Sequence, residues 1–178
     1  MPGLKTFDHH RFDNGLTLVA QSMPWLESAA FSIAIPAGCR YDSPDKVGTA
    51  NFVCEMVQRG CGQLDSRQFL DELQMLGVDY YSSVSNHHTH FGGALKSTQL
   101  HETLSIYRDV IRDPAMPSNQ IEDGRQVCIQ EIMSLEDDLS KQAMLSSRLR
   151  FYGDPDGRHG DGTLDSIAAI SADDLQQF

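Results

Sequence analysis

A polar cluster with possible metal chemistry lies within residues 46–59, which the sequence predicts to form a helix. Asn51, Glu55 and Gln58 are spaced at i, i+4 and i+7, so their side chains share one helix face. Cys54 could bind zinc as a thiolate and Glu55 could supply one oxygen, but Asn51 is a poor zinc ligand. Because a zinc site needs three or four ligands in a tetrahedral array, we interpret the segment as an amphipathic helix with its polar face toward water or a cleft.

Two further segments contain residue types that bind metals. His88 and His90 are two residues apart in a predicted strand, so they project from the same face and could chelate a metal if a third ligand came from elsewhere. Residues 154–162 alternate acids with Gly and Pro, but they lack the regular acid spacing and the distal Glu of an EF-hand. We interpret the two histidines as surface or cross-strand residues and residues 154–162 as a flexible loop.

The composition restricts the classes of partner. The chain has 178 residues and a formal net charge of −11, which argues against nucleic acid and against anionic membrane surfaces. It is compatible with basic peptides, although solvated acidic faces explain the charge equally well. No apolar run approaches the ~20 residues of a membrane span.

The cysteines and the N-terminus indicate a reducing compartment. The four cysteines contain no C-x-x-C pair, and their density is far below that of a disulfide scaffold. Residues 1–10 have no apolar core, so we expect no secretory signal. The expectation is therefore four ordinary buried thiols in a cytoplasmic protein.

Hydrophobic periodicity and turn residues predict the elements that must position the polar cluster. Ser66 is the expected N-cap of the second helix, and Leu100, Leu104, Tyr107 and Ile111 form the expected apolar stripe of the third. Residues 171–174 should cap a last short helix. The predicted strands are 11–22 (with an early turn at 13–15), 29–36, 79–85 and 88–96, and the predicted helices are 46–59, 67–76, 99–112 and 118–150.

This order of elements predicts an α+β fold, an antiparallel sheet with helices packed mainly on one face. Phe31, Ile33 and Ile35 alternate along the second strand, which indicates that one face of the sheet is buried. On the long final helix the apolar stripe is expected to run from Ile121 to Leu149. We expect residues 1–178 to form a single domain.

Several segments in a fixed order resemble the insulinase, pitrilysin and mitochondrial-processing-peptidase family. Its zinc helix reads roughly G-T-A-H-F-L-E-H-M, an inverted H-x-x-E-H motif, and residues 48–57 here read GTANFVCEMV. The other similar segments are residues 10–19, 36–42, 69–77, 151–158 and 164–175. The family places another strand after its last helix, so the resemblance implies an N-terminal half-domain that is truncated at its C-terminal end.

The resemblance also implies that the zinc chemistry has been lost. The two zinc-binding His positions hold Asn51 and Glu55, and the general-base position holds Cys54. The family's third ligand, a Glu on the long helix, corresponds to Glu131, while a second family Glu is replaced by Gly124. We therefore expect no catalytic residues, no bound metal and no cofactor, although the family uses zinc. A remodelled site of Glu55, Glu131 and Cys54 is the weaker alternative.

By resemblance, the chain is a non-catalytic homologue or subunit that helps an active zinc peptidase form a peptide-binding chamber. Its expected partners are that active subunit or a second copy of itself, and possibly peptides, with no nucleic acid and no membrane. Two alternatives remain open: a zinc endopeptidase with an unconventional metal site, and a self-associating scaffold without a peptide role.

Overall fold

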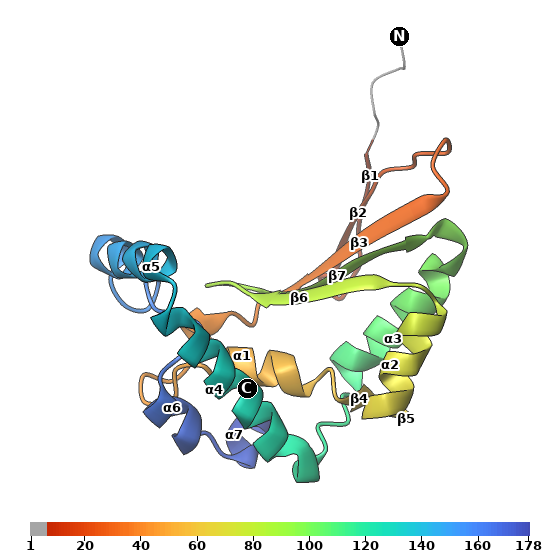
Figure 1. The fold of residues 1–178 in the computed structure, drawn as a ribbon. Helices are drawn as coiled ribbons and strands as arrows, with labels where there is room; N and C mark the ends of the chain where they lie inside the picture. The colour runs from red at the N-terminus through yellow and green to blue at the C-terminus, as the bar shows by residue number, and fades with distance from the viewer. Residues whose placement is uncertain (1–6) are drawn as a thin grey trace.

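The computed structural model describes residues 7–178, and its centre is a three-stranded antiparallel sheet (Figure 1). The strands are β3 (Ser28–Ile35), β7 (Thr89–Lys96) and β6 (Asp79–Val84), in the order β3-β7-β6. Along β3 the side chains of Phe31, Ile33 and Ile35 alternate with exposed neighbours, as predicted. The segment 1–6, on which the prediction about a secretory signal largely rests, lies outside the described residues.

Helices pack against one face of this sheet, which confirms the predicted α+β class (Figure 1). Two clusters of buried side chains form the core. One lies between the sheet, α2 and α3, and the other lies where α1 and α4 meet the C-terminal helices. The helices are α1 (Thr49–Met56), α2 (Ser66–Met75), α3 (Leu100–Arg112), α4 (Ile121–Glu136), α5 (Leu139–Tyr152), α6 (Leu164–Ala169) and α7 (Ala172–Gln177).

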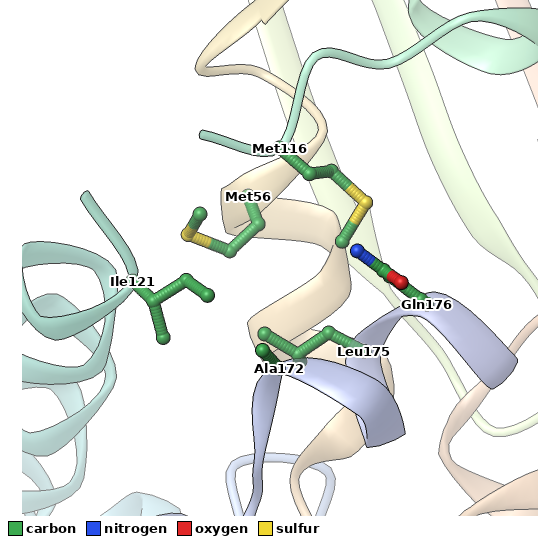
Figure 2. A pocket seen from close by; sticks show the side chains of 6 residues that line it. All are labelled: Met56, Met116, Ile121, Ala172, Leu175 and Gln176. Carbon is green, nitrogen blue, oxygen red and sulfur yellow. The ribbon is translucent and has the colours of Figure 1, made fainter. Parts of the chain in front are cut away.

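The helix α1 joins the two core clusters, because it contributes side chains to both. Cys54 belongs to the cluster beneath the sheet, whereas Phe52 and Met56 belong to the second cluster. Met56 also lines a small hollow between α1, α4 and α7 (Figure 2). The other residues around this hollow are Met116, Ile121, Ala172, Leu175 and Gln176. The lining is almost entirely apolar and supplies no group for chemistry.

The N-terminal strand prediction was wrong in its extent. Residues 11–22 do not form one strand; a hairpin pairs β1 (Asp8–Arg11) with β2 (Thr17–Ala20) across a turn closed by the Phe12 N–H and the Leu16 carbonyl. A second, unpredicted hairpin pairs β4 (Gly60–Cys61) with β5 (Leu64–Asp65). Two-residue strands are too short to leave a periodic pattern in the sequence.

The helix around the zinc-like motif is shorter than the predicted range 46–59. Its N-cap is Gly48 at φ 104°, a left-handed conformation that the interior of a helix does not allow, and its C-cap is Val57. The cap of α2 was also placed one residue too late. Asp65, not Ser66, accepts the Arg67 and Gln68 N–H groups, while the Ser66 hydroxyl donates to the Arg59 carbonyl.

The predicted helix 118–150 is in fact two helices. The break falls at Asp137 and Asp138, where the Asp138 carboxylate accepts the Lys141 N–H at 2.9 Å and starts α5. The expected apolar stripe therefore fails beyond the break, and Leu139 and Leu149 are exposed. Sequence periodicity did not detect the break because Asp is tolerated in helix interiors as well as at caps.

The buried face of α3 differs from the predicted stripe. Tyr107 is fully buried against the rings of Phe31 and Phe91, but Leu104 and Ile111 are on the exposed side. Thr103 and Val110 are buried in their place. The C-terminal region holds two short helices rather than one, capped by Thr163 and by the predicted Ser171.

Candidate functional site

The N-terminus of α1 is anchored by a buried carboxylate. Asp42 is only 4% exposed, and its two oxygens accept the N–H groups of Gly48 at 2.8 Å and of Ala50 at 2.9 Å. These donors are among the N–H groups that a helix start leaves without a partner. Burial raises the pKa of Asp42, and the two N–H bonds and nearby Arg158 oppose that rise.

Arg158 connects this anchor to the loop that precedes α6. Its guanidinium donates to the Asp42 carbonyl at 2.6 Å and to both carboxylate oxygens of Asp154 at 2.8 and 2.7 Å. The Arg158 side chain is 6% exposed. Residues 154–162 form a loop, as predicted, and Arg158 bonds this loop to the residue that anchors the start of α1. No pattern in the sequence indicates that Arg158 bonds to Asp42, because the two residues are far apart in the chain.

The polar face of α1 meets α4 through an amide–carboxylate bond. Asn51 Nδ2 donates to Glu131 Oε2 at 2.9 Å, so two of the four motif positions lie in contact although 80 residues separate them. The amide N–H takes one of the roughly four lone-pair sites of the carboxylate. This bond links the two helices without any ion.

Glu55, at the second histidine position, is directed toward its own helix. Its carboxylate accepts Arg59 Nε at 3.1 Å and Arg59 Nη2 at 2.8 Å, an i,i+4 pair at the end of α1. Arg59 also reaches Gln120 Oε1 at 3.5 Å. The role of Arg59 was missed in the sequence, although its spacing from Glu55 is the usual signal for such a pair.

Cys54 occupies the general-base position as a buried thiol. It is 5% exposed, and burial raises its pKa to about 11, with the negative charges of Glu55 and Glu131 adding to the rise. At neutral pH the thiol is protonated, and it is neither a base nor a ready zinc ligand. Beside it, Gln58 Nε2 donates to the Cys54 carbonyl at 2.7 Å and to Ser82 Oγ on β6 at 3.0 Å.

Gly124 leaves no room for the carboxylate that the family has at this position. A Cβ at Gly124 would lie 2.6 Å from Met56 Sδ and 3.1 Å from Phe52 Cε2. The absence of a side chain lets α4 approach α1 closely, and the apolar side chains of α1 fill the space. Met56 and Phe52 of α1 therefore occupy the space that a side chain at position 124 would need.

The donor set on α1 and α4 does not fit a zinc ion. Asn51 and Glu131 bind each other, Glu55 is paired with Arg59, and Cys54 is a buried neutral thiol. Within residues 7–178 no group of three or more His, Cys, Asp or Glu side chains is arranged to hold a metal.

The other two segments with metal-binding residue types have different partners. The rings of His88 and His90 are 5.8 Å apart between centroids, and His87 bonds instead to Arg40, with 3.0 Å between Nδ1 and Nη1. In the loop, Asp154 is paired with Arg158, and Asp161 lies 3.6 Å from His159 and 4.0 Å from Lys141.

The chain is similar to known proteins over most of its length. The sequence model for the family described as insulinase (peptidase family M16) matches residues 17–151. An uncharacterized zinc protease of Rickettsia bellii is 25% identical over 98% of this chain and 42% of its own length. The mitochondrial-processing peptidase subunit beta of Lentinula edodes is 26% identical over 93% of this chain and 36% of its own length.

A solved structure shows the same fold. The inactive domain of a peptidase M16 from Pseudomonas fluorescens superposes with a TM-score of 0.85 and 17% identity, covering 97% of this chain and 42% of that one. The chain therefore spans about two fifths of the length of these three proteins. No helix among the described residues is long and apolar enough to cross a membrane.

Proposed function

This chain belongs to the insulinase family (peptidase family M16), and we propose that within it the chain is a non-catalytic member. The observation that carries the proposal is the hydrogen bond from Asn51 Nδ2 to Glu131 Oε2. It joins two positions at which the family motif has zinc ligands. Here the two side chains bond to each other.

The chemistry of the remaining motif positions supports the same proposal. Hydrolysis by this family's route needs a metal that lowers the pKa of a bound water and a carboxylate that takes its proton. Cys54 stands where that carboxylate would be, and its thiol keeps its proton at neutral pH. The carboxylate of Glu55 is already neutralised by Arg59.

The proposed role is to shape a peptide-binding chamber beside an active zinc peptidase subunit. The strand β6 is an edge of its sheet, because β7 is its only neighbour within the described residues. The outer N–H and C=O groups of an edge strand can pair with an extended peptide. Gln58, just after α1, donates to Ser82 of β6, and this bond ties the end of the helix to the edge strand.

The family context supports a role as one half-domain of a larger assembly. The Pseudomonas fluorescens structure shows that the same fold occurs as an inactive domain of a peptidase. For this chain the partner, the peptide and the half-domain arrangement are proposals. A reducing compartment such as the cytoplasm is proposed from the four free, buried thiols.

Zinc stoichiometry in two matched proteins tests the proposal. The natural chain, loaded with excess ZnCl₂ and then dialysed, should retain well under one zinc per chain. The triple variant Asn51→His, Cys54→Glu, Glu55→His restores the H-x-x-E-H pattern opposite Glu131, and we expect it to retain zinc. One zinc per natural chain would contradict the proposal and favour an unconventional zinc endopeptidase.

A second measurement separates the chamber role from a scaffold without a peptide role. Co-expressed with an active zinc peptidase from the same organism, the chain should co-purify with it and lower the KM for its peptide substrate. Co-purification without any change in peptide binding would favour the scaffold and contradict the chamber role.

A further inference from the structure

Two histidines lie where three segments that are distant in the sequence meet. The segments are the turn 85–88 between β6 and β7, the short helical turn 39–41, and the loop 154–162 that follows α5. Asn86 joins them, because its amide donates to the Asp156 carbonyl and its side-chain oxygen accepts from Arg148 of α5. We call this contact region the histidine junction, since it contains His87 and His159.

The Nδ1 atom of each histidine faces a group that can only donate. Arg40 Nη1 lies 3.0 Å from His87 Nδ1, and the main-chain N–H of Asp161 donates to His159 Nδ1 at 3.1 Å. Because a guanidinium and a main-chain N–H have no acceptor, each Nδ1 must accept, and each ring must carry its single proton on Nε2. This geometry therefore requires both imidazoles to be neutral.

Protonation would turn both hydrogen bonds into contacts between two donors. An imidazolium has an N–H group on each ring nitrogen. The new proton on Nδ1 would point at the Arg40 guanidinium in one case and at the Asp161 N–H in the other, so both bonds would be lost. Histidine is the side chain whose ordinary pKa lies closest to neutral pH, and a mildly acidic solution is therefore enough to produce this change.

His159 is half-buried and lies beside two cations of α5. Its side chain is 26% exposed, and the charged groups that surround it are Asp161, Lys141 and Arg148. Burial lowers the pKa of His159, Asp161 opposes this effect, and the two cations add to it. Since a lowered folded pKa means weaker proton binding in the folded state, stability is lost as the pH falls from the unfolded value, about 6.5, toward the folded value.

His87 is exposed, and its cation is shared with a carboxylate. Arg40 contacts the His87 ring and also lies 3.4 Å from the Asp156 carboxylate. The other charged or titratable groups near His87 are Arg148, which bonds to the adjacent Asn86, and the ring of His88, 6.3 Å away between centroids. A charged His87 would repel Arg40 and weaken the attachment of the turn between β6 and β7 to residues 39–41.

We propose that the histidine junction is a pH-sensitive contact, closed when His87 and His159 are neutral and open when both are charged. Opening separates the turn 85–88 and α5 from residues 159–162. The neighbouring bond from Arg158 to Asp42 involves no histidine, so it persists and the opening is local. The turn directly follows β6, so acid loosens the end of that edge strand. The inference does not depend on the proposed function.

Nitrogen NMR of the imidazoles tests the geometric premise on the natural chain. At about pH 8, well above the ordinary pKa, His87 and His159 should each show the Nε2–H tautomer alone, and both should become imidazolium by about pH 5. The variants His87→Asn and His159→Asn assign the two signals. An Nδ1–H tautomer, a tautomer mixture or a charged ring at the higher pH would overturn the proposal.

The thiol of Cys39 reports whether the junction opens. It is 2% exposed and lies 3.6 Å from Asn86 Oδ1, whereas Cys61, 1% exposed, lies in the core beneath the sheet and serves as the internal reference. Dithiodipyridine reacts with accessible thiols in acid as well as at neutral pH. Labelling of Cys39 relative to Cys61 should rise roughly fivefold between about pH 8 and about pH 5, because a buried thiol reacts only through local opening.

Matched variants connect this labelling to the two histidines. The double variant His87→Asn, His159→Asn keeps an acceptor oxygen on each side chain but cannot be charged, so its Cys39 should stay protected at both pH values. His101→Asn, at an exposed position of α3, should behave like the natural chain. Each single variant should lose part of the increase, which gives the same comparison if the double variant does not fold. No increase in the natural chain, or an equal increase in the Asn variants, would overturn the proposal.

Discussion

The N-terminus of α1 and its polar face differ in how their side chains are buried and bonded. At its N-terminus, Asp42, Gly48 and Arg158 form a buried, fully bonded anchor. One turn later, Asn51 and Glu55 stand at the positions that correspond to the family's zinc ligands, and they bond to Glu131 and Arg59. The start of α1 is thus held by a buried anchor, whereas the residues one turn later differ from the family's zinc ligands.

The difference follows from burial. In the anchor each polar group is buried and depends on the others, so the loss of one leaves the remainder without partners. On the polar face the groups are partly exposed, and water can replace a lost bond. A buried network can change only at a large cost in folding free energy, whereas exposed side chains can change with little effect on the fold.

The largest expected effect is at the anchor. Asp42→Ala removes the acceptor of the Gly48 and Ala50 N–H groups, and we expect about 3 kcal/mol of lost stability. Asp42→Asn keeps one oxygen acceptor in a similar shape and should cost less. Urea unfolding followed by circular dichroism measures both variants. An Asp42→Ala protein as stable as the natural chain would remove the contrast between the two parts of α1.

The next effect concerns the space beside Gly124. Gly124→Glu restores the residue type that the family has here, but its side chain meets Met56 and Phe52, and we expect a loss of about 2 kcal/mol. Gly124→Ala is the matched control. Its Cβ meets the flexible end of Met56, and the better helix propensity of Ala offsets part of the cost. Equal stability of the Glu variant and the natural chain would show that α4 moves freely away from α1.

A smaller effect is expected on the polar face itself. Glu131→Gln and Asn51→Ala each perturb an exposed hydrogen bond, so each should change the unfolding free energy by less than about 1 kcal/mol. If the chain acts in a complex, Glu131→Gln should also leave the activity of that complex nearly unchanged. A thousandfold loss of activity would identify a working metal centre at this position.

The smallest expected effect is a pH dependence between α7 and the loop before α1. The hydrogen bond from Lys46 holds the pKa of Asp174 well below its usual 3.8. A depressed carboxyl pKa stabilises the folded state above the unfolded pKa, and this contribution is lost as the pH falls through the folded value. Lys46→Met should therefore reduce the loss of stability between about pH 5 and about pH 2. An unchanged acid profile would show that the Lys46 bond does not set this pKa.

Periodicity and caps in the sequence predicted most of the elements correctly. The alternation of Phe31, Ile33 and Ile35 predicted a half-buried strand, and Ser171 predicted the cap of the last helix. The predictions failed where local patterns were ambiguous. The pattern around Asp138 fits the interior of a helix as well as a cap. Leu104 fits the predicted apolar stripe of α3, but it is not among the buried residues of that helix.

The motif alone determined that the family's ligand types are missing at Asn51, Cys54 and Glu55, because residue identity fixes which atoms are available to a metal. The sequence by itself also determined the fold class, through the order of its periodic segments.

Only the tertiary structure decided what the replacements do. The pairing of Asn51 with Glu131 and the closure of Arg158 onto Asp42 join residues that are distant in the chain. Such bonds depend on how helices and loops pack, and no local pattern encodes them. The same is true of α5, whose apolar residues resemble those of a core helix until the fold leaves them uncovered.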